Sequence, residues 1–215
     1  MLGLHHANST LPCMTLIKFI EIVAILVGAF SGFIEARRKR MDLVGVFTVA
    51  FIAAFGGGTL RDILLDRRPL FWVTHQEYAI AIFVLALIAS PLIRTLRHIV
   101  SERLIVIADA VGLGLFSIAG VSAALDANMP LFIASMMGVI TGIFGGVLRD
   151  IVCNEVPMVF RDGKPYAICA FLGNWMFLLM GLYTSVSHDF ALWSSALFIS
   201  VLRLITWKFD IQMGR

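Results

Sequence analysis

The stretch AFGGGTLRD at residues 54–62 decides how this chain is interpreted. Three successive glycines, and then an arginine beside an aspartate, interrupt an otherwise apolar run. A glycine costs about 1 kcal/mol relative to alanine inside a helix, and a charged side chain at the centre of a bilayer costs roughly 2.5–3.5 kcal/mol. Because both features are costly, we expect each of them to have a structural or functional role.

The composition is that of a membrane protein. Of the 215 residues, 60% are hydrophobic and 14% are charged, whereas soluble domains average about 45–50% and about 25%. A hydrocarbon core about 30 Å thick needs about 20 helical residues to span it. Seven apolar runs meet this requirement, at 16–36, 43–66, 77–96, 102–125, 131–153, 165–184 and 190–209. We therefore predict an all-α membrane protein with seven transmembrane helices in a single domain over 1–215, preceded by a polar tail at 1–15.

The basic residues predict the orientation in the membrane. Most of the 17 Lys and Arg residues fall on the side that holds the loops after the first, third and fifth spans and the C-terminal end. These residues are Arg37, Arg38, Lys39, Arg40, Arg94, Arg97, Arg103, Arg161, Lys164, Arg203, Lys208 and Arg215. By the positive-inside rule, we expect the C-terminus in the cytoplasm and the N-terminus outside.

The chain contains a repeat. Displacing the sequence by 88 residues, the spacing from Arg61 to Arg149, aligns GGTLRDILLDRRP at 57–69 with GGVLRDIVCNEVP at 145–157. One offset that holds across three predicted helices indicates a duplication. Each copy, at 16–96 and 102–184, has three spans, so the second copy enters the membrane from the opposite side. This inverted arrangement is common in transport proteins, and the helix at 190–209 is an addition to it.

Adjacent glycines predict that the second and fifth spans are broken near mid-membrane. The glycines are Gly56, Gly57, Gly58, Gly145 and Gly146. Close helix packing is the alternative explanation, but consecutive positions point in different directions and cannot share one seam. Unwound backbone is tolerated at membrane depth only where it is buried in protein or lines a wet cavity, where its carbonyls can contact a cation. Thr59 would add a hydroxyl oxygen there.

Four charges lie within these two spans, and they are Arg61, Asp62, Arg149 and Asp150. Facing lipid would be too costly for them. Because helical neighbours at i and i+1 do not face each other, we expect each charge to find its partner elsewhere. The charges line or gate a pore, or they lock the bundle through ion pairs, and both roles can hold at once.

Two further acids occupy equivalent positions in the repeat, Glu21 and Asp109. We place both near the start of a span, where the helix dipole favours a carboxylate. A role in the pore is the second interpretation.

The chain lacks the motifs of an enzyme. The triple glycine is not followed by the Lys and Ser/Thr of a phosphate-binding loop, and the three cysteines have no C-x-x-C spacing. The net charge of +3 is explained by topology, without nucleic-acid binding. We therefore predict no catalytic residues, no cofactor and no resident metal, and no soluble protein partner can be inferred.

The doubled G-G-x-L-R-D-I motif, in this helical pattern, resembles the prokaryotic branch of the trimeric intracellular cation (TRIC) channel family over residues 16–209. The resemblance implies a homotrimer in the plasma (inner) membrane of a prokaryote, with a separate pore in each protomer that conducts K⁺ in preference to Na⁺. The glycine clusters and the two Arg-Asp pairs match the family motif. The second repeat departs from the first by having Phe144 where Gly56 stands, so the two kinks need not be equally open.

A transporter is the alternative function. Prokaryotic relatives have been described as glycine transporters, and an inverted repeat with discontinuous helices also suits alternating access. In that case an arginine would complete a site for the carboxylate of a small solute such as glycine. In a cation channel, by contrast, an arginine repels the permeant ion unless a neighbouring carboxylate neutralises it. A non-conducting membrane scaffold is a third possibility. Membrane lipids are expected partners, with the basic segment at 37–40 as a candidate contact for anionic lipid.

Overall fold

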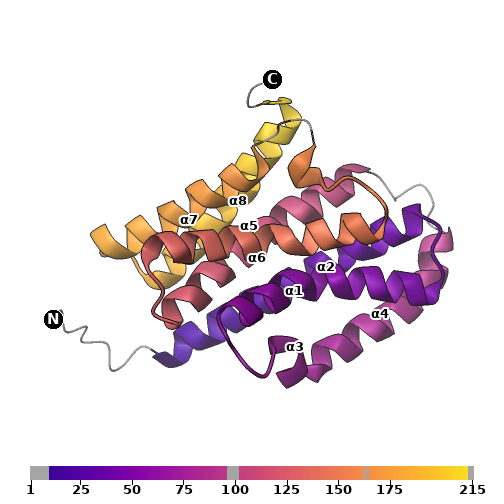
Figure 1. Ribbon diagram of the computed structural model, residues 1–215, viewed down its shortest axis with the longest axis horizontal. Coiled ribbons are helices and arrows are strands. Elements are labelled where there is room, and N and C mark those ends of the chain that lie inside the picture. The colour runs from indigo at the N-terminus through magenta and orange to yellow at the C-terminus, as the bar shows by residue number, and fades with distance from the viewer. Residues whose placement is uncertain (1–9, 96–101, 162, 164, 213–215) are drawn as a thin grey trace.

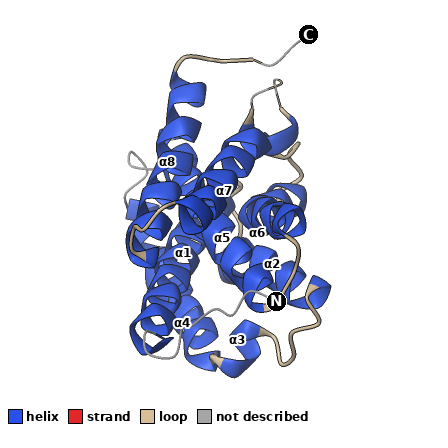
Figure 2. Cartoon of the chain, turned by 90° about the vertical axis from the view of Figure 1, so that its left-hand side faces the viewer, coloured by secondary structure: helices blue, strands red, loops and turns tan. Residues whose placement is uncertain are grey.

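The computed structural model describes residues 10–95, 102–161, 163 and 165–212, and all the regular structure in these ranges is helical (Figure 2). The elements are α1 (Thr10–Arg38), α2 (Leu43–Leu64), α3 (Phe71–Thr74), α4 (Gln76–Thr95), α5 (Glu102–Asp126), α6 (Leu131–Val152), η1 (Met158–Phe160), α7 (Tyr166–Tyr183) and α8 (His188–Lys208). The predicted fold class, an all-helical membrane protein, is confirmed.

Six of the described helices are long and apolar enough to cross a membrane, namely α1, α2, α5, α6, α7 and α8. In α4, the apolar stretch Gln76–Ile88 is shorter. The count of seven spans therefore stays a prediction. Helix α1 begins at Thr10, within the predicted tail at 1–15, and its candidate membrane span begins at Phe19. Residues 1–9 of that tail, and Arg97, Lys164 and Arg215 of the charge count, lie outside the described residues.

The helices form two groups around a shared centre (Figure 1). On one side α1 and α2 pack together, with α4 against both of them. On the other side α7 packs on α6 and α8, and α8 also covers α5. The groups meet where α2 crosses α6 and where α1 lies along α5.

Several helix ends recur at the spacing of the repeat. The turn after α1 has Arg40 at φ 58°, and the turn after α5 has Asn128 at φ 56°. In the same way Asp66, which follows α2, has φ 51°, and Asn154, which follows α6, has φ 54°. Non-glycine residues seldom adopt this left-handed conformation. Two such pairs, each 88 residues apart, show that the chain turns in the same way in both halves.

The predicted interruption of the second and fifth spans is wrong. α2 is one α-helix through Gly57, and α6 is one α-helix through Gly145. These glycines instead let the two backbones touch. A Cβ on Gly57 would lie 2.1 Å from the carbonyl oxygen of Thr141, and one on Gly145 would lie 2.6 Å from that of Ala53. Close packing through small residues, the alternative explanation, accounts for both positions. A bend of either helix axis stays a prediction.

The neighbouring glycines serve a different face of each helix. A Cβ on Gly58 would meet only a guanidinium nitrogen of Arg61, at 4.0 Å. One on Gly146 would lie 3.1 Å from Asp109 Oδ1 and 3.7 Å from Arg149 Nη2. Consecutive glycines therefore do not need to share one seam. One of each pair allows the helix contact, and the next leaves room for a charged group.

We expect Gly57→Ala to lower the thermal stability of the protein, because the added methyl group would overlap a backbone oxygen of α6. Overpacking of this kind costs typically about 1–3 kcal/mol. Thermal unfolding of the purified protein in detergent measures the change. The matched control is Gly181→Ala in α7, where a Cβ would meet nothing within 4 Å. Equal melting temperatures for the two variants would show that the α2–α6 contact is not as tight as described.

Candidate functional site

The first arginine cluster consists of Arg61, Asp62 and Glu21. Arg61 Nη1 donates to Glu21 Oε1 at 2.9 Å, and Arg61 Nε donates to Asp62 Oδ1 at 2.9 Å. The second oxygen of Asp62 accepts the backbone N–H of Phe71, the first residue of α3, at 2.9 Å. Arg61 and Asp62 are buried. The buried guanidinium is therefore compensated by two carboxylates, one from α1 and one from its own helix.

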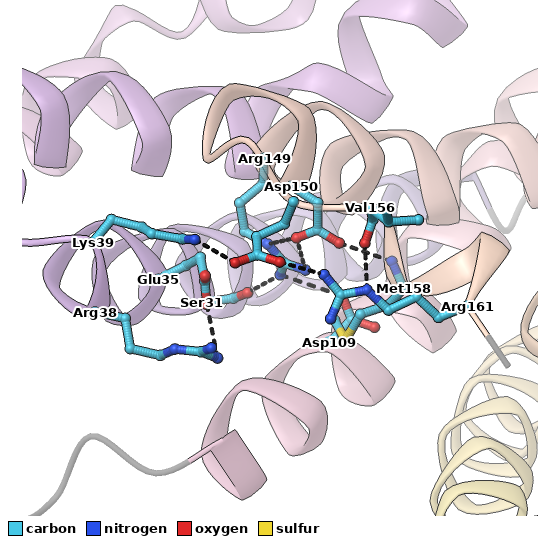
Figure 3. Close-up of polar contacts among 11 residues, drawn as sticks. Ser31, Glu35, Arg38, Lys39, Asp109, Arg149, Asp150, Val156, Met158 and Arg161 are labelled. Atoms are coloured by element: carbon cyan, nitrogen blue, oxygen red, sulfur yellow. Dashed lines mark hydrogen bonds and ion pairs between the residues drawn. The ribbon is translucent and has the colours of Figure 1, made fainter.

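The second arginine cluster consists of Arg149, Asp150 and Asp109 (Figure 3). Arg149 Nε donates to Asp150 Oδ1 at 2.9 Å, and its Nη1 lies 3.3 Å from Asp109 Oδ1. The second oxygen of Asp150 accepts the backbone N–H of Met158, the first residue of η1, at 2.9 Å. In each cluster the more distant acid precedes the arginine by 40 residues.

Two additional hydroxyl groups enclose the second cluster. Arg149 Nη1 donates to Ser31 Oγ, which comes from α1, and the Tyr166 hydroxyl donates to Asp109 Oδ2. The second cluster is also the better shielded of the two. The side chain of Asp109 is 5% exposed, whereas that of Glu21 is 14% exposed.

The prediction that each charge finds a partner on another segment is correct, but the exclusion of pairing between neighbours is wrong. Arg61 bonds to Asp62, and Arg149 bonds to Asp150. Both pairs lie in the last turn of a helix. There the aspartate turns to accept an N–H from the next element, and the long arginine side chain reaches it through Nε.

Glu21 lies near the start of the candidate membrane span Phe19–Arg38, as predicted, but not near the start of its helix. Because α1 begins at Thr10, Glu21 lies about three turns inside the helix. Asp109 lies in the second turn of α5. A role in the pore stays a prediction, and both acids are ion-pair partners of the arginines, a role that we did not predict for them. The shared spacing of 40 residues to the arginine is the signal in the sequence that could have shown it.

Thr59 has a partner of its own, since its hydroxyl accepts the indole N–H of Trp72 at 3.2 Å. The sequence analysis missed Ser31 and Tyr166. Tyr166 aligns with Tyr78 in the repeat, but Tyr78 stacks on Phe71 with ring centroids 5.7 Å apart. The repeat therefore indicated a tyrosine at this place in each half, and nothing in the sequence indicated that only one of them bonds to the cluster.

In the described part of the chain, four cavities with room for at least one water lie near the clusters. The largest, the first-cluster mouth, has a volume of about 260 Å³ and is lined by Glu21, Arg61, Asp62, Arg67, Pro69, Phe71, Thr74, His75, Ala119, Ala123 and Asp126. The first-cluster pocket, of about 20 Å³, lies beside it and includes Gly58, Thr59 and Trp72 in its wall. The second-cluster pocket, also of about 20 Å³, includes Ser31, Asp109 and Gly146. The second-cluster mouth, of about 30 Å³, includes Glu35, Asp150 and Glu155.

Successive cavities share wall residues. Arg61 lines both the first-cluster mouth and the first-cluster pocket. Phe116 lines both pockets, and Arg149 lines the second-cluster pocket and the second-cluster mouth. We call this series, in which each cavity shares a wall residue with the next, the row of cavities; an arginine cluster lies toward each end of it.

Ion pairs bridge the second-cluster mouth (Figure 3). Glu155 accepts a hydrogen bond from Lys39, in the turn after α1, and Arg161 Nη2 lies 2.7 Å from its other oxygen. The hydrogen bond and charge of Lys39, with the bond from Arg161, lower the pKa of the Glu155 carboxyl below its ordinary value. The pairs link the end of α1 to the segment after α6.

A family model described as "Glycine transporter" matches this chain twice, at residues 18–93 and 106–181. The two matches begin 88 residues apart and end 88 residues apart. The spacing found in the sequence motif is thus also the spacing of the two matches to the family model.

Bacterial membrane proteins are similar to this chain. The UPF0126 inner membrane protein YadS of Escherichia coli K12 is 38% identical over 159 residues, which cover 74% of this chain and 76% of that protein. A UPF0126 membrane protein of Vibrio cholerae is 34% identical over 199 residues, covering 92% and 82%.

Solved structures are similar as well. The TRIC trimeric intracellular cation channel orthologue from Rhodobacter sphaeroides superposes with a TM-score of 0.83 at 30% identity, covering 92% of this chain and all of that one. A second TRIC cation channel, studied for the structural basis of its conductance, gives a TM-score of 0.77 at 32% identity, covering 92% and 96%.

The fold is that of a multi-pass helical membrane protein, and its site consists of two buried arginine clusters. The chain belongs to the prokaryotic branch of the TRIC family, and its UPF0126 relatives and the matched family model fall in the same group.

We expect Arg149→Met to destabilise the protein more than Arg61→Met does. The first change leaves Asp109 and Asp150 buried without a counter-charge, and breaking a buried pair in this way costs about 3–5 kcal/mol. After the second change, Glu21 can draw water from the first-cluster mouth. Thermal unfolding of both purified variants gives the order, and adding Asp109→Asn to Arg149→Met should recover part of the loss. A larger loss for Arg61→Met would contradict this account.

Proposed function

We propose that this chain is a monovalent cation channel of a homotrimer, conducting through the row of cavities inside each protomer. The observation that carries the proposal is that row, which runs from one mouth through two pockets to the other mouth between the arginine clusters. The structures that it resembles are those of cation channels, one of them named as trimeric. The proposed wall is formed by α2 and α6 together with α1 and α5.

The charge of the clusters supports cation selectivity. Each cluster sets two carboxylates against one guanidinium, so each carries a formal charge of −1 when all three groups are ionised. A local potential of one sign attracts ions of the other sign into a cleft with low-dielectric walls. The arginines are therefore more than neutralised and do not exclude cations.

The same contacts disfavour transport of an amino acid. A transporter would use an arginine to bind the carboxylate of its substrate, but Arg61 and Arg149 are each occupied by two carboxylates. The two pockets, of about 20 Å³ each, are also small, since a single water needs roughly 10–15 Å³. An ion that has lost most of its water can enter them, and glycine cannot.

Hydration supports K⁺ as the preferred ion. The first-cluster pocket is lined mostly by apolar side chains, including Ile25, Ala54 and Phe55. Such a wall replaces little of the hydration shell of an ion. Because K⁺ is larger than Na⁺ and holds its water less tightly, K⁺ passes such a wall at a lower cost.

An inverted repeat completes the proposal. It is supported by two contacts, that of Gly57 with Thr141 and that of Gly145 with Ala53. A shift of 88 residues takes position 57 to 145 and position 53 to 141, so each contact is the counterpart of the other in the repeat.

With the N-terminus outside and the C-terminus in the cytoplasm of a prokaryotic inner membrane, the first-cluster mouth opens outward and the second-cluster mouth opens inward. α8 then serves packing and assembly, and the basic segment at 37–40 meets anionic lipid headgroups on the cytoplasmic face. No cofactor is required.

Single-channel recording of the purified full-length protein in planar bilayers tests the function. We expect discrete current steps, and in a KCl gradient a reversal potential close to the equilibrium potential of K⁺. Replacing KCl by NaCl on one side should shift that potential in favour of K⁺. Saturable uptake of glycine into liposomes, without unitary currents, would instead establish a transporter.

Asp126→Asn should lower the conductance at low salt and have little effect at high salt. Asp126 is exposed in the wall of the first-cluster mouth, where its charge concentrates cations. Screening lengths of about 10 Å at 0.1 M and about 3 Å at 1 M predict that this effect fades as the salt rises. The control is Asp189→Asn, because Asp189 is exposed in the first turn of α8 and lines none of the four cavities. A salt-independent loss in Asp126→Asn would argue against a surface charge effect.

A further inference from the structure

We propose that Arg203 in α8 is a positioning residue for the second arginine cluster: it holds the ring of Tyr166, whose hydroxyl holds Asp109 at the second-cluster pocket. The proposal rests on the proposed function and names a residue that sets the cation selectivity of that same path. Arg203 lines none of the four cavities. It can therefore influence the path only through its neighbours or through its charge.

Two contacts connect α8 to the cluster. The guanidinium carbon of Arg203 lies 4.5 Å from the centre of the Tyr166 ring, and the Tyr166 hydroxyl donates to Asp109 Oδ2. The other oxygen, Asp109 Oδ1, lies 3.3 Å from Arg149 Nη1. A Cβ on Gly146 in the pocket wall would lie 3.1 Å from the same Oδ1. With Oδ2 bonded to the tyrosine, Oδ1 is the oxygen left for the arginine and for the pocket.

Among the described residues, Arg203 is buried without an ion-pair partner. It is 2% exposed, and its Nε and Nη1 have no hydrogen-bond partner there. A buried charge in a membrane helix bundle is normally paired, as Arg61 and Arg149 are. The face of an aromatic ring attracts a cation most strongly where water is excluded. The Tyr166 ring therefore supports the guanidinium, and the guanidinium fixes the ring in return.

The repeat explains why a residue of α8 is needed for this. In the first half the ring of Tyr78, the counterpart of Tyr166, stacks on Phe71 with centroids 5.7 Å apart. The 88-residue shift places Val159 at the position of Phe71, so the second half has no aromatic ring there. α8, which has no counterpart in the repeat, packs mainly on α5 and α7 (Figure 1). Its Arg203 covers the face of Tyr166 in place of the missing ring.

The two ways in which Arg203 can act have opposite signs. Its positive charge alone opposes cations near the second cluster, so removing that charge would favour cations. Its hold on Tyr166 keeps the charge of Asp109 at the pocket. Without that hold, the carboxylate is free to turn both oxygens onto Arg149, because an arginine can bind a carboxylate through two parallel bonds. Replacing a positioning residue therefore lowers cation selectivity, whereas replacing a residue that acts only by its charge raises it.

Reversal potentials of the full-length protein in planar bilayers, under a KCl gradient, measure the selectivity for K⁺ over Cl⁻. These potentials do not depend on how many channels fold, so a loss of stability alone does not move them. We expect Arg203→Met and Tyr166→Phe each to lower the permeability ratio of K⁺ to Cl⁻ several-fold. A ratio that is unchanged or raised in Arg203→Met would overturn the proposal.

A double variant tests the route through Tyr166. Tyr166→Phe keeps the ring but removes the hydroxyl that bonds to Asp109. Adding Arg203→Met to it should therefore not lower the ratio further. A further several-fold loss in the double variant would show that Arg203 acts by another route, and would overturn the proposal.

Two controls are matched to these variants. Lys208→Met replaces another basic residue of α8, which is exposed and lies 5.8 Å from the centre of the Phe209 ring. Tyr78→Phe removes the same hydroxyl from the equivalent position of the first half, where the tyrosine lines none of the four cavities. Both should keep the wild-type ratio. A loss in Tyr78→Phe as large as in Tyr166→Phe would show that the effect does not depend on Asp109, which contradicts the proposal.

The same recordings separate the failure of the positioning role from the failure of the channel. If the wild-type protein carries no cation current at any salt concentration, the proposed function is wrong and the role of Arg203 falls with it. If the wild type conducts and the Arg203 and Tyr166 variants select cations as the wild type does, the channel stands and only the positioning role is wrong.

Discussion

The contact between the backbones of α2 and α6 determines where the functional groups lie. Gly57 meets the carbonyl oxygen of Thr141, and Gly145 meets that of Ala53. Each helix continues for about one turn beyond its glycine before it reaches its arginine. A pair of helices that touch in this way directs Arg61 toward one mouth and Arg149 toward the other.

The buried charges follow from that geometry. A guanidinium in the interior of a membrane helix bundle is tolerated only when it is paired, and here each arginine is held by two carboxylates. In the proposed channel, a surplus of one negative charge, present when all three groups of a cluster are ionised, would let a single arrangement stabilise the bundle and attract cations. The two interpretations of the charges in the sequence, structural pairing and a pore lining, are therefore compatible. The halves differ in detail, because among the described residues a serine and a tyrosine hydroxyl hydrogen-bond to the second cluster and not to the first.

The sequence predicted the helices and the repeat well, because both depend on patterns along the chain. For five of the six helices that could span a membrane, the apolar runs located both ends to within two residues, whereas α1 begins earlier than predicted, at Thr10. One constant offset related Arg61 to Arg149 and Glu21 to Asp109. The partners of the charges were only partly predictable. Pairing of Arg61 with Asp62 depends on a side-chain rotamer and on an N–H supplied by α3. The predicted break at Gly57 failed because a glycine that permits a close neighbour looks, in one sequence, like a glycine that permits a kink. Only the position of Thr141, on another helix, distinguishes a glycine that permits close packing from one that permits a kink.

The contact at Gly57 also limits what comparison of related sequences can reveal. The atom that a side chain at this position would strike is the main-chain oxygen of Thr141. Every amino acid carries that oxygen, so no replacement at position 141 can make room for a larger residue at position 57. The two positions touch closely but are not free to vary together. Methods that detect proximity from correlated substitutions would therefore pass over the contact on which the architecture of this family member depends.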